Sequence, residues 1–335
     1  MEPHAALEEI AYLLERERSS RYKSKAFRAA ATAIAGLDDA ALRDPALRRR
    51  KGIGDSTYTV IQQALAGQVP EYLAQLRDRD AGSGAAASAL RGQPRGDLHA
   101  HSDWSDGLTS IDLMVEAARA LGHEYQALTD HSPRLRVANG LSADRLRAQL
   151  RVVSEVNTET GPEFTLLSGI EVDILEEGAL DQEPELLDEL DVVVASAHSR
   201  LRMERGPMTR RLVAAASSPH VDVLGHVTGR LVEGSRGTRP PSTFDARAVF
   251  EACAAHGVAV EINSRPERQD PPDDLLAIAL GLGCLFSIDS DAHAPGQLSL
   301  IEYGAERAQR AGIPADRIVT TWPLDRLREW TGRAR

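Results

Sequence analysis

The spacing of hydrophobic residues divides the chain into two parts. Up to residue 80, apolar positions recur every three or four residues, which predicts helices over 5–18, 21–34, 56–66 and 70–79 and a short helical segment over 40–50. From residue 96 onward, short apolar runs alternate with longer amphipathic stretches. Residues 81–95 begin with AGSGAAAS, which is linker composition. We therefore predict a helical domain over 1–80, a linker over 81–95 and an α/β domain over 96–335.

The α/β part contains eight apolar runs that are typical of strands. They lie at 96–100, 127–131, 165–174, 192–198, 221–226, 258–263, 285–291 and 317–322. The helix-like segments between them lie at 110–121, 142–159, 209–217, 246–256 and 272–282. Strands that are apolar on both faces and alternate with helices form parallel sheets.

Seven or eight such units in the segment 96–335 favour a TIM-like barrel, to which the tail 294–335 contributes the last elements. An open doubly wound sheet is the alternative. No glycine-rich phosphate loop of the GxGxxG or GxxxxGK type follows a strand, which counts against a nucleotide-binding sheet.

Composition narrows the class of protein. Hydrophobic residues make up 42% and charged residues 27% of the 335 positions, which suits a soluble chain with a sizeable core. The longest uncharged apolar run, 275–288, is too short to span a bilayer, and the N-terminus lacks the features of a secretory signal. Cys253 and Cys284 lie apart in apolar settings, as buried thiols do in a reducing compartment. We expect a cytoplasmic protein without a membrane segment.

Charge differs between the two parts. Residues 1–80 carry 13 Lys and Arg against 12 Asp and Glu, a net charge of +1. The whole chain has a net charge of −11, so residues 81–335 carry a net charge of −12. An acidic surface does not by itself attract polyanions. Carboxylates that gather around bound cations are a different case, because the metal reverses the local field.

Six of the ten histidines lie at the C-terminal ends of predicted strands, together with carboxylates. These strand ends read DLHAH (97–101), TDH (129–131), GIE (169–171), SAH (196–198), GH (225–226) and DSDAH (289–293). In a parallel barrel all such ends open onto one face, where active sites are built. Imidazoles mixed with carboxylates suit Zn²⁺, Mn²⁺ or Fe²⁺. A single His-x-His pair is usually only solvated, but burying six imidazoles without an ion or water is costly, so the set predicts a metal site.

The other four histidines are interpreted as structural or surface residues. His123 and His256 each stand beside a glycine at the end of a predicted helix, where a cation is favoured. His4 lies in the N-terminal tail, and His220 lies in a loop before a strand.

The motifs DLHAHSDWSDG, TDHS, GIEVDI, SAHS, GHVTGR, EINSRPERQD and SDAH, in this order along residues 96–293, resemble the polymerase and histidinol phosphatase (PHP) superfamily. The likeness is greatest to the PHP domain at the C-terminus of bacterial family X DNA polymerases. It implies a distorted (β/α)₇ barrel, joined here to a small all-α domain, with a trinuclear metal centre.

The resemblance also implies nine ligands for three divalent ions. One ion takes His99, His101, Glu171 and Asp291, a second takes Glu171, His198 and His226, and a third takes Asp106, His131 and His293. All nine positions hold residues able to bind a metal, although the Ser-Asp-Gly around Asp106 also reads as a plain turn.

Metal ions in such a centre activate water and clamp phosphoryl oxygens, so the expected reaction is hydrolysis of a phosphate ester, with Glu171 shared between two ions. Asp130 is a candidate to orient a ligand or carry a proton, and its alternative role is that of a hydrogen-bond partner behind the ligands. Four arginines near strand ends are candidates for phosphate contacts, namely Arg200, Arg230, Arg265 and Arg268.

The N-terminal part resembles the helical domain of family X polymerases. Arg50, Lys51, Gly52 and Gly54, ahead of TYTVI, resemble a helix-hairpin-helix, whose glycines and amide groups approach a nucleic-acid phosphate. Further cations precede them, at Arg48, Arg49, Arg21, Lys23, Lys25 and Arg28. We therefore expect DNA to be a partner.

Two features depart from that motif. Tyr58 stands where the motif normally has a small alanine, and residues 56–66 contain no lysine for Schiff-base chemistry. No polymerase palm fits between the two domains, so the chain is not expected to be a polymerase.

Three functions remain open from the sequence. The first is a metal-dependent phosphoesterase on nucleic acid, such as a 3′→5′ exonuclease or a DNA 3′-end-processing enzyme. The second is a small-molecule phosphomonoesterase of the histidinol-phosphatase type, which the acidic barrel favours. The third is a non-catalytic DNA-binding protein with structural metals, against which the complete ligand set counts.

Overall fold

The computed structural model describes residues 1–18, 20–82, 90, 92–234 and 237–332. The chain divides into two compact units, one formed by 1–84 with 294–297 and the other by 85–293 with 298–335. Of the predicted linker, residues 83–89 and 91 lie outside the described residues. Among the described residues, no helix is both long and apolar enough to cross a bilayer.

The first unit is helical. Its elements are α1 (Pro3–Arg16), α2 (Arg21–Ile34), α3 (Asp39–Arg43), a 3₁₀ helix (Pro45–Arg49), α4 (Asp55–Leu65) and α5 (Glu71–Gly82). The apolar stripes of these helices share one core, which includes Leu7, Ile10, Phe27, Ile61 and Leu73.

Seven parallel strands form the centre of the second unit. They are β1 (Gly96–Asp97), β2 (Tyr125–Leu128), β3 (Thr165–Asp173), β4 (Val192–Ser196), β5 (Val223–Leu224), β6 (Ala259–Asn263) and β7 (Leu285–Asp289). Each strand pairs with the next along the chain, in the order β1 to β7. Beyond β1 and β7, Ala100 forms a parallel bridge with Ala292, and the N–H of His101 donates to the Ala292 carbonyl at 2.8 Å. The sheet therefore closes on itself at the C-terminal ends of its first and last strands.

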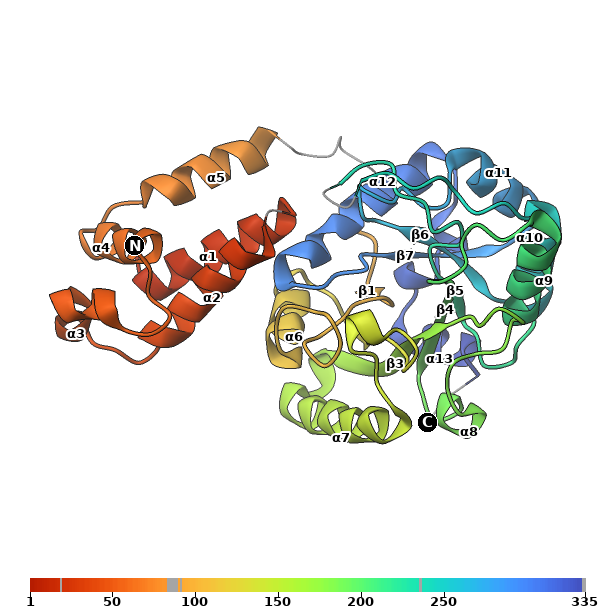
Figure 1. Ribbon diagram of the computed structural model, residues 1–335, viewed down its shortest axis with the longest axis horizontal. Coiled ribbons are helices and arrows are strands. Elements are labelled where there is room, and N and C mark those ends of the chain that lie inside the picture. Colours follow the sequence, from red (N-terminus) through yellow and green to blue (C-terminus); the bar gives the residue numbers. More distant parts are fainter. Residues whose placement is uncertain (19, 83–89, 91, 235–236, 333–335) are drawn as a thin grey trace. The chain divides into compact units, whose positions relative to one another are not determined.

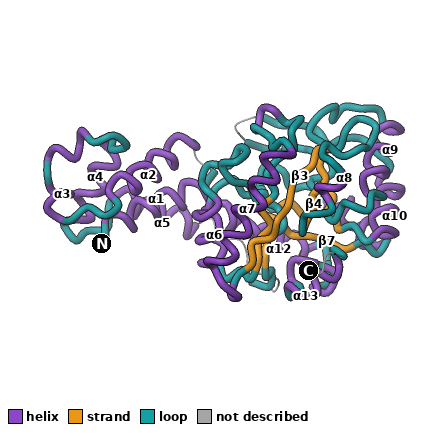
Figure 2. The backbone as a smooth tube through the Cα atoms, turned by 90° about the horizontal axis from the view of Figure 1, so that it is seen from below, coloured by secondary structure: helices purple, strands orange, loops and turns teal. Residues whose placement is uncertain are grey.

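Helices surround these strands (Figures 1 and 2). They are α6 (Ile111–Ala120), α7 (Ala143–Thr160), α8 (Pro184–Leu187), α9 (Arg205–Ala216), α10 (Ala246–His256), α11 (Asp273–Gly281), α12 (Ile301–Arg310) and α13 (Leu324–Trp330). The predicted TIM-like barrel with seven β/α units is confirmed, and the alternative of an open doubly wound sheet is wrong.

Alternation along the strands directs the chemistry to one end of the barrel. On β4, Val193 and Ala195 pack in the core shared with the outer helices, whereas Val192 and Val194 pack in an inner cluster with residues of the neighbouring strands. Because side chains alternate between the two faces of a strand, the inner row continues from Val194 to His198. Apolar side chains thus fill the lower interior, and the polar ones follow at the C-terminal ends.

The predicted strand at 317–322 is wrong. Two 3₁₀ helices, Ala315–Arg317 and Val319–Thr321, take its place, with a single bridge between Ile318 and Phe286. The apolar run of this segment suggested a strand, but β1 and β7 already meet and leave no position for an eighth. The segment instead packs under the barrel, where the hydroxyl of Tyr125 donates to the Trp322 carbonyl at 2.9 Å.

His123 differs from its sequence interpretation as a cation at a helix end. It follows α6 and precedes β2, with only 7% of its surface exposed. Burial lowers its pKa to about 4. The side chain is therefore a neutral member of the barrel wall at neutral pH.

This burial makes the stability of the barrel depend on pH. Because the folded pKa of His123, about 4, lies below its ordinary value of 6.5, the unfolded chain binds a proton that the folded chain does not as the pH falls between these values. Between pH 7 and pH 5 we expect the wild type to lose about 2 kcal/mol more unfolding free energy than His123→Leu.

Urea unfolding followed by tryptophan fluorescence measures this difference, since Trp104, Trp322 and Trp330 all lie in the second unit. The exposed His256→Leu is the matched control for the substitution itself. If the unfolding free energies of the wild type and His123→Leu changed equally between pH 7 and pH 5, the lowered pKa of His123 would be contradicted.

Candidate metal centre

All nine predicted ligands lie together at the C-terminal mouth of the barrel. Eight of them lie within six of the seven strands or follow these strands within four residues, and Asp106 lies further along the loop after β1. Among the described residues they form four overlapping groups whose ligand atoms lie within 4.8 Å of one another. These groups are His101, Asp106, His131 and His293; His99, Glu171 and His226; His99, His101 and Asp291; and His131, Glu171 and His198.

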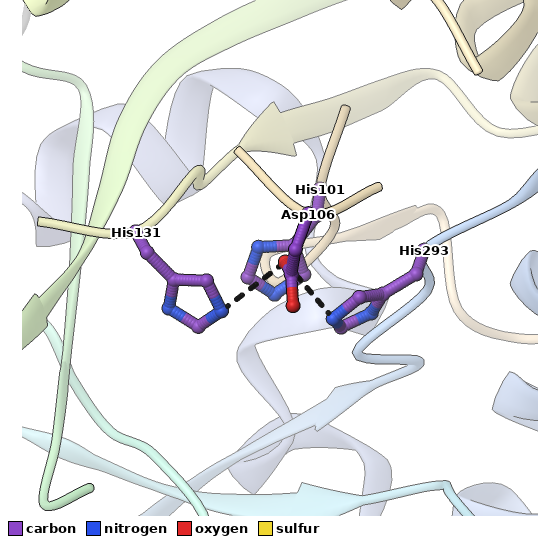
Figure 3. A group of neighbouring side chains, drawn as sticks. All are labelled: His101, Asp106, His131 and His293. Carbon is purple, nitrogen blue, oxygen red and sulfur yellow. Dashed lines mark ion pairs between the residues drawn. The ribbon is translucent and has the colours of Figure 1, made fainter. Parts of the chain in front are cut away.

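The first of these groups surrounds Asp106 (Figure 3). Its Oδ1 atom lies 3.4 Å from Nε2 of His131 and 3.3 Å from Nε2 of His293. Asp106 stands in the loop after β1, whose chain turns back so that the N–H of Gly107 donates to the Ser102 carbonyl at 2.9 Å. The turn expected around Asp106 is therefore present, and it brings the carboxylate to the imidazoles.

Glu171 belongs to two of the three remaining groups and lies near both imidazoles of the third. Its carboxylate is 1% exposed, and its two oxygens face ring nitrogens from four other strand ends. The distances are 3.3 Å to His99, 3.6 Å to His101, 2.8 Å to His131, 3.1 Å to His198 and 2.8 Å to His226. Glu171 lies within β3, so its position is fixed by parallel pairing with β4.

The donor atoms fit a cation. Seven buried atoms of the candidate ligands make no hydrogen bond to any described residue, namely His99 Nε2, His101 Nδ1, His101 Nε2, Asp106 Oδ1, His131 Nδ1, His198 Nδ1 and His226 Nδ1. Two ligands held at about 2.1 Å from one Zn²⁺ lie about 3.0–3.4 Å apart. His99 Nε2 and Glu171 Oε2, at 3.3 Å, show that spacing without the geometry of a hydrogen bond. The residues present therefore suit divalent metal ions.

The observed groups differ in detail from those that the resemblance implied. His101 lies with Asp106, His131 and His293 as well as with His99 and Asp291. His131 lies with Glu171 and His198 in addition to Asp106, because its two ring nitrogens face opposite carboxylates. The division of the nine ligands among three ions stays a prediction.

Burial and charge act against each other throughout the mouth. Burial opposes ionisation of Glu171, but His198, His99 and His131 outweigh it and hold its pKa well below the ordinary value. Burial, with His293 and His131 nearby, lowers the pKa of His101 to about 3, which leaves its ring neutral. For His99, burial lowers the pKa, yet the carboxylates of Glu171 and Glu261 raise it well above the ordinary value. The field that retains a proton there also favours a metal cation.

Asp291 is held in an unusual backbone conformation. Its φ of 52° lies in the left-handed region, which an aspartate tolerates better than most residues. Burial opposes its ionisation, but Arg265 and Arg268 hold its pKa well below the ordinary value. Nε of Arg268 donates to Oδ2 at 3.1 Å, and Oδ1 lies 3.6 Å from Nε2 of His101.

The four candidate arginines occupy different environments. Arg265 donates to the Asp291 carbonyl at 3.0 Å, and its Nη1 lies 3.1 Å from Nδ1 of His293. Arg230 instead donates to the carbonyls of Arg268 and Gln269. Arg200 is exposed and pairs with Glu176 at 3.0 Å. The geometry favours Arg265 and Arg268 as neighbours of the centre.

Asp130 lies behind the mouth. It accepts hydrogen bonds from the hydroxyls of Ser102, at 2.6 Å, and Ser105, and from the amide of Gln149 at 2.7 Å. These contacts fix the loop that carries Asp106. They suit the alternative role of Asp130 as a hydrogen-bond partner and give no support to proton transfer.

Two acidic residues next to the ligands were missed from the sequence. Asp173 accepts from the backbone N–H of His198 at 3.0 Å, and its Oδ1 lies 3.3 Å from Nδ1 of that imidazole. Glu261 lies 2.5 Å from Nδ1 of His99. A sequence signal existed in both cases, since each acid stands within an apolar strand, in GIEVDI and in VAVEIN.

The predicted nucleic-acid contacts lie in the first unit, between the 3₁₀ helix and α4. Arg50, Lys51, Gly52 and Gly54 are exposed there. Gly52 has a φ of 93°, and a Cβ at this position would lie 3.1 Å from the Ala29 carbonyl, so the hairpin requires glycine. The helix-hairpin-helix assignment stays a prediction.

Three side chains near the hairpin have partners within the first unit. Arg28, one of the cations that precede the hairpin in the sequence, has its guanidinium paired with Glu15 at 2.9 Å and with Glu8. Arg48 pairs with Asp55 at 2.7 Å. The unexpected Tyr58 packs against the core of this unit, and the guanidinium carbon of Arg48 lies 5.9 Å from the centre of its ring.

Comparisons with known proteins agree with the motifs. The family described as "PHP domain" matches residues 97–265. A DNA polymerase/3′-5′ exonuclease of Bacillus subtilis is 39% identical over 219 residues, which cover 65% of this chain and 38% of that protein. This chain thus spans well under half of that relative's length.

Two further relatives are smaller. A probable phosphatase of Vibrio parahaemolyticus is 28% identical over 237 residues, which cover 67% of this chain and 88% of that protein. The structure of a histidinol phosphate phosphatase from Lactococcus lactis, solved with zinc, L-histidinol and phosphate, matches with a TM-score of 0.48 and 19% identity, over 66% of this chain and 95% of that one. The domain match spans half of the sequence, so the chain belongs to the PHP domain family of metal-dependent phosphoesterases.

Proposed function

We propose that this protein hydrolyses phosphate esters with three divalent ions, Zn²⁺, Mn²⁺ or Fe²⁺, held by the nine side chains at the barrel mouth. The observation that carries the proposal is the set of four overlapping histidine and carboxylate groups within 4.8 Å. When bound, such ions supply an activated water and neutralise charge on the phosphoryl group.

The chain's own residues prepare the site for a phosphate. Glu171 lies between imidazoles of opposite sides of the mouth and keeps them at ligand spacing. Arg265 and Arg268, 13% and 12% exposed, place guanidinium groups beside Asp291, where they orient phosphoryl oxygens by paired hydrogen bonds.

Nucleic acid is the proposed substrate, through 3′→5′ exonuclease or 3′-end-processing activity on DNA. Two observations support it. The exposed Arg50 and Lys51 flank a hairpin that requires glycine, and the Bacillus relative is described as a polymerase and 3′-5′ exonuclease.

The buried, unpaired thiols of Cys253 and Cys284 favour the cytoplasm as the compartment.

A phosphomonoesterase acting on a small metabolite is the second candidate. The probable phosphatase of Vibrio favours it, because the alignment covers 88% of that protein. The net charge of −12 beyond residue 80 also suits a small substrate better than a polyanion. A third role, DNA binding with structural metals only, does not explain a mouth with arginines beside the ligands.

Metal content tests the centre. The wild type, dialysed against Zn²⁺ or Mn²⁺, should retain ions, and His99→Ala/His101→Ala should retain at least one fewer per chain, because it removes ligand atoms from three of the four groups. Elemental analysis by mass spectrometry measures this. His220→Ala/His256→Ala removes two imidazoles outside the mouth and should match the wild type. Full retention by the first variant would contradict the ligand assignment.

Substrate choice separates the two candidate reactions. The full chain with Mn²⁺ should shorten 3′-labelled single-stranded DNA, and Arg50→Glu/Lys51→Glu should weaken that activity while leaving hydrolysis of p-nitrophenyl phosphate unchanged. Two lost phosphate contacts should also reduce the salt dependence of DNA binding by a slope of about 2.

Arg119→Glu/Arg151→Glu makes the same change of charge on exposed positions of α6 and α7 and is the matched control. If only histidinol phosphate and p-nitrophenyl phosphate are hydrolysed, and the hairpin variant behaves as the wild type, the nuclease proposal is wrong.

The arginines should differ in effect. Arg265→Ala should lower kcat/KM for p-nitrophenyl phosphate by about ten- to a hundredfold, because it removes charge-assisted hydrogen bonds beside Asp291 and His293. Arg200→Ala, which alters an exposed pair with Glu176, should stay close to the wild type. Steady-state kinetics at constant metal content decides, and equal effects of both substitutions would contradict the geometry.

A further inference from the structure

Strand β6 is the exception among the seven strands of the barrel. The other six carry a candidate ligand or are followed by one within four residues, whereas β6 has none. Its inward row nevertheless passes from Ala259, in the inner apolar cluster, to Glu261 and Asn263, both fully buried. A carboxylate and an amide in the interior need a reason, since burial without partners is costly.

The partners of Glu261 are the ligands themselves. Its Oε1 lies 2.5 Å from Nδ1 of His99, which follows β1. Its Oε2 accepts from the backbone N–H of His226, which follows β5, and from the side-chain amide of Asn263 at 3.2 Å. One carboxylate thus contacts two ligand-bearing segments, the one that follows β1 and the one that follows β5.

This contact determines which nitrogen of His99 is available. A carboxylate accepts hydrogen bonds, so Nδ1 of His99 carries the hydrogen and Nε2 faces the ligand groups. Nε2 is buried, makes no hydrogen bond to a described residue and lies 3.3 Å from Oε2 of Glu171. The ring is therefore presented to the cation position by the one nitrogen able to bind there.

Asn263 extends the contact to a third ligand. Its amide donates to Oε2 of Glu261 at 3.2 Å and to Oδ2 of Asp291 at 3.1 Å. Asp291 needs such a restraint, because its backbone has a φ of 52°. The side chains of β6 therefore connect His99, His226 and Asp291 without entering the ligand groups.

We propose that Glu261 is a positioning residue of the metal centre: it fixes the tautomer and ring orientation of His99 and the backbone of His226, and with Asn263 it holds Asp291. The inference rests on the proposed metal centre and deepens it. Hydrogen-bond partners of metal-binding imidazoles typically contribute about ten- to a hundredfold to metal affinity.

A buried carboxylate at the other end of the barrel gives the comparison. Asp222 is 7% exposed and accepts from the N–H of Val193 at 2.8 Å, just before β5 and so at the opposite end of the barrel. Substituting Asp222 removes a buried charge from the same barrel without touching a candidate ligand.

The experiment titrates the full-length protein with Co²⁺, whose visible absorption reports ligand geometry, and measures Zn²⁺ affinity by competition with a chromophoric chelator. Glu261→Ala should bind at least one ion about ten- to a hundredfold more weakly and alter the Co²⁺ spectrum. Glu261→Gln, which keeps one acceptor oxygen, should show a smaller loss of affinity. Asp222→Asn should keep the affinity and spectrum of the wild type.

Circular dichroism melting identifies variants that fail to fold, and Glu261→Gln then replaces Glu261→Ala as the deciding variant. A wild type that binds the ions, with both Glu261 variants matching it in affinity and spectrum, would overturn the positioning role alone. A wild type that binds neither Co²⁺ nor Zn²⁺ would overturn the proposed metal centre and, with it, this inference.

Discussion

Glu171 is a carboxylate that is 1% exposed, and the groups that face it are imidazoles from five other positions. A neutral imidazole has one N–H donor and one lone pair. Nε2 of His226 forms a hydrogen bond with Oε1 of Glu171 at 2.8 Å. The nitrogens of His99, His101 and His131 that face Oε2 make no hydrogen bond, and a lone pair there does not stabilise a buried carboxylate oxygen. Cations between them resolve this repulsion, either protons on some rings or metal ions shared by several. Positive charge at the mouth therefore stabilises this arrangement, and the ligand atoms are spaced as divalent ions require.

Apolar packing elsewhere in the barrel stabilises a fold that buries many polar groups at its mouth. Its lower interior is apolar, with Val192, Val194 and Ala259 in one cluster, and the outer faces of the strands pack against helices. The polar inward positions follow toward the C-terminal ends, as Glu261 and Asn263 do after Ala259 on β6. Parallel strands bring all of these positions to one end, so residues from 99 to 293 meet although each element obeys local rules of alternation.

Local patterns predicted the barrel and brought eight of the nine candidate ligands to notice, whereas Asp106 and the assignment of all nine as ligands rested on the resemblance to the PHP superfamily. A histidine or an acid at the end of an apolar run is visible without knowing what lies across the barrel. Glu261 and Asp173 were missed because their roles depend on which side chain meets them from another strand. The ion pairs of Arg28 were not foreseen for the same reason, since Glu8 and Glu15 reach it from another helix. The strand expected at 317–322 failed because closure between β1 and β7 is a property of the whole sheet.

The central claim is that the side chains around Glu171 and Asp106 enclose divalent ions. Diffraction from crystals grown with Zn²⁺, collected on both sides of the zinc absorption edge, tests it directly. The account predicts anomalous peaks among the imidazoles at the barrel mouth, each within about 2.0–2.3 Å of nitrogen and oxygen ligands of this set. Ordered imidazoles with no anomalous peak between them, or zinc bound only elsewhere on the surface, would contradict it.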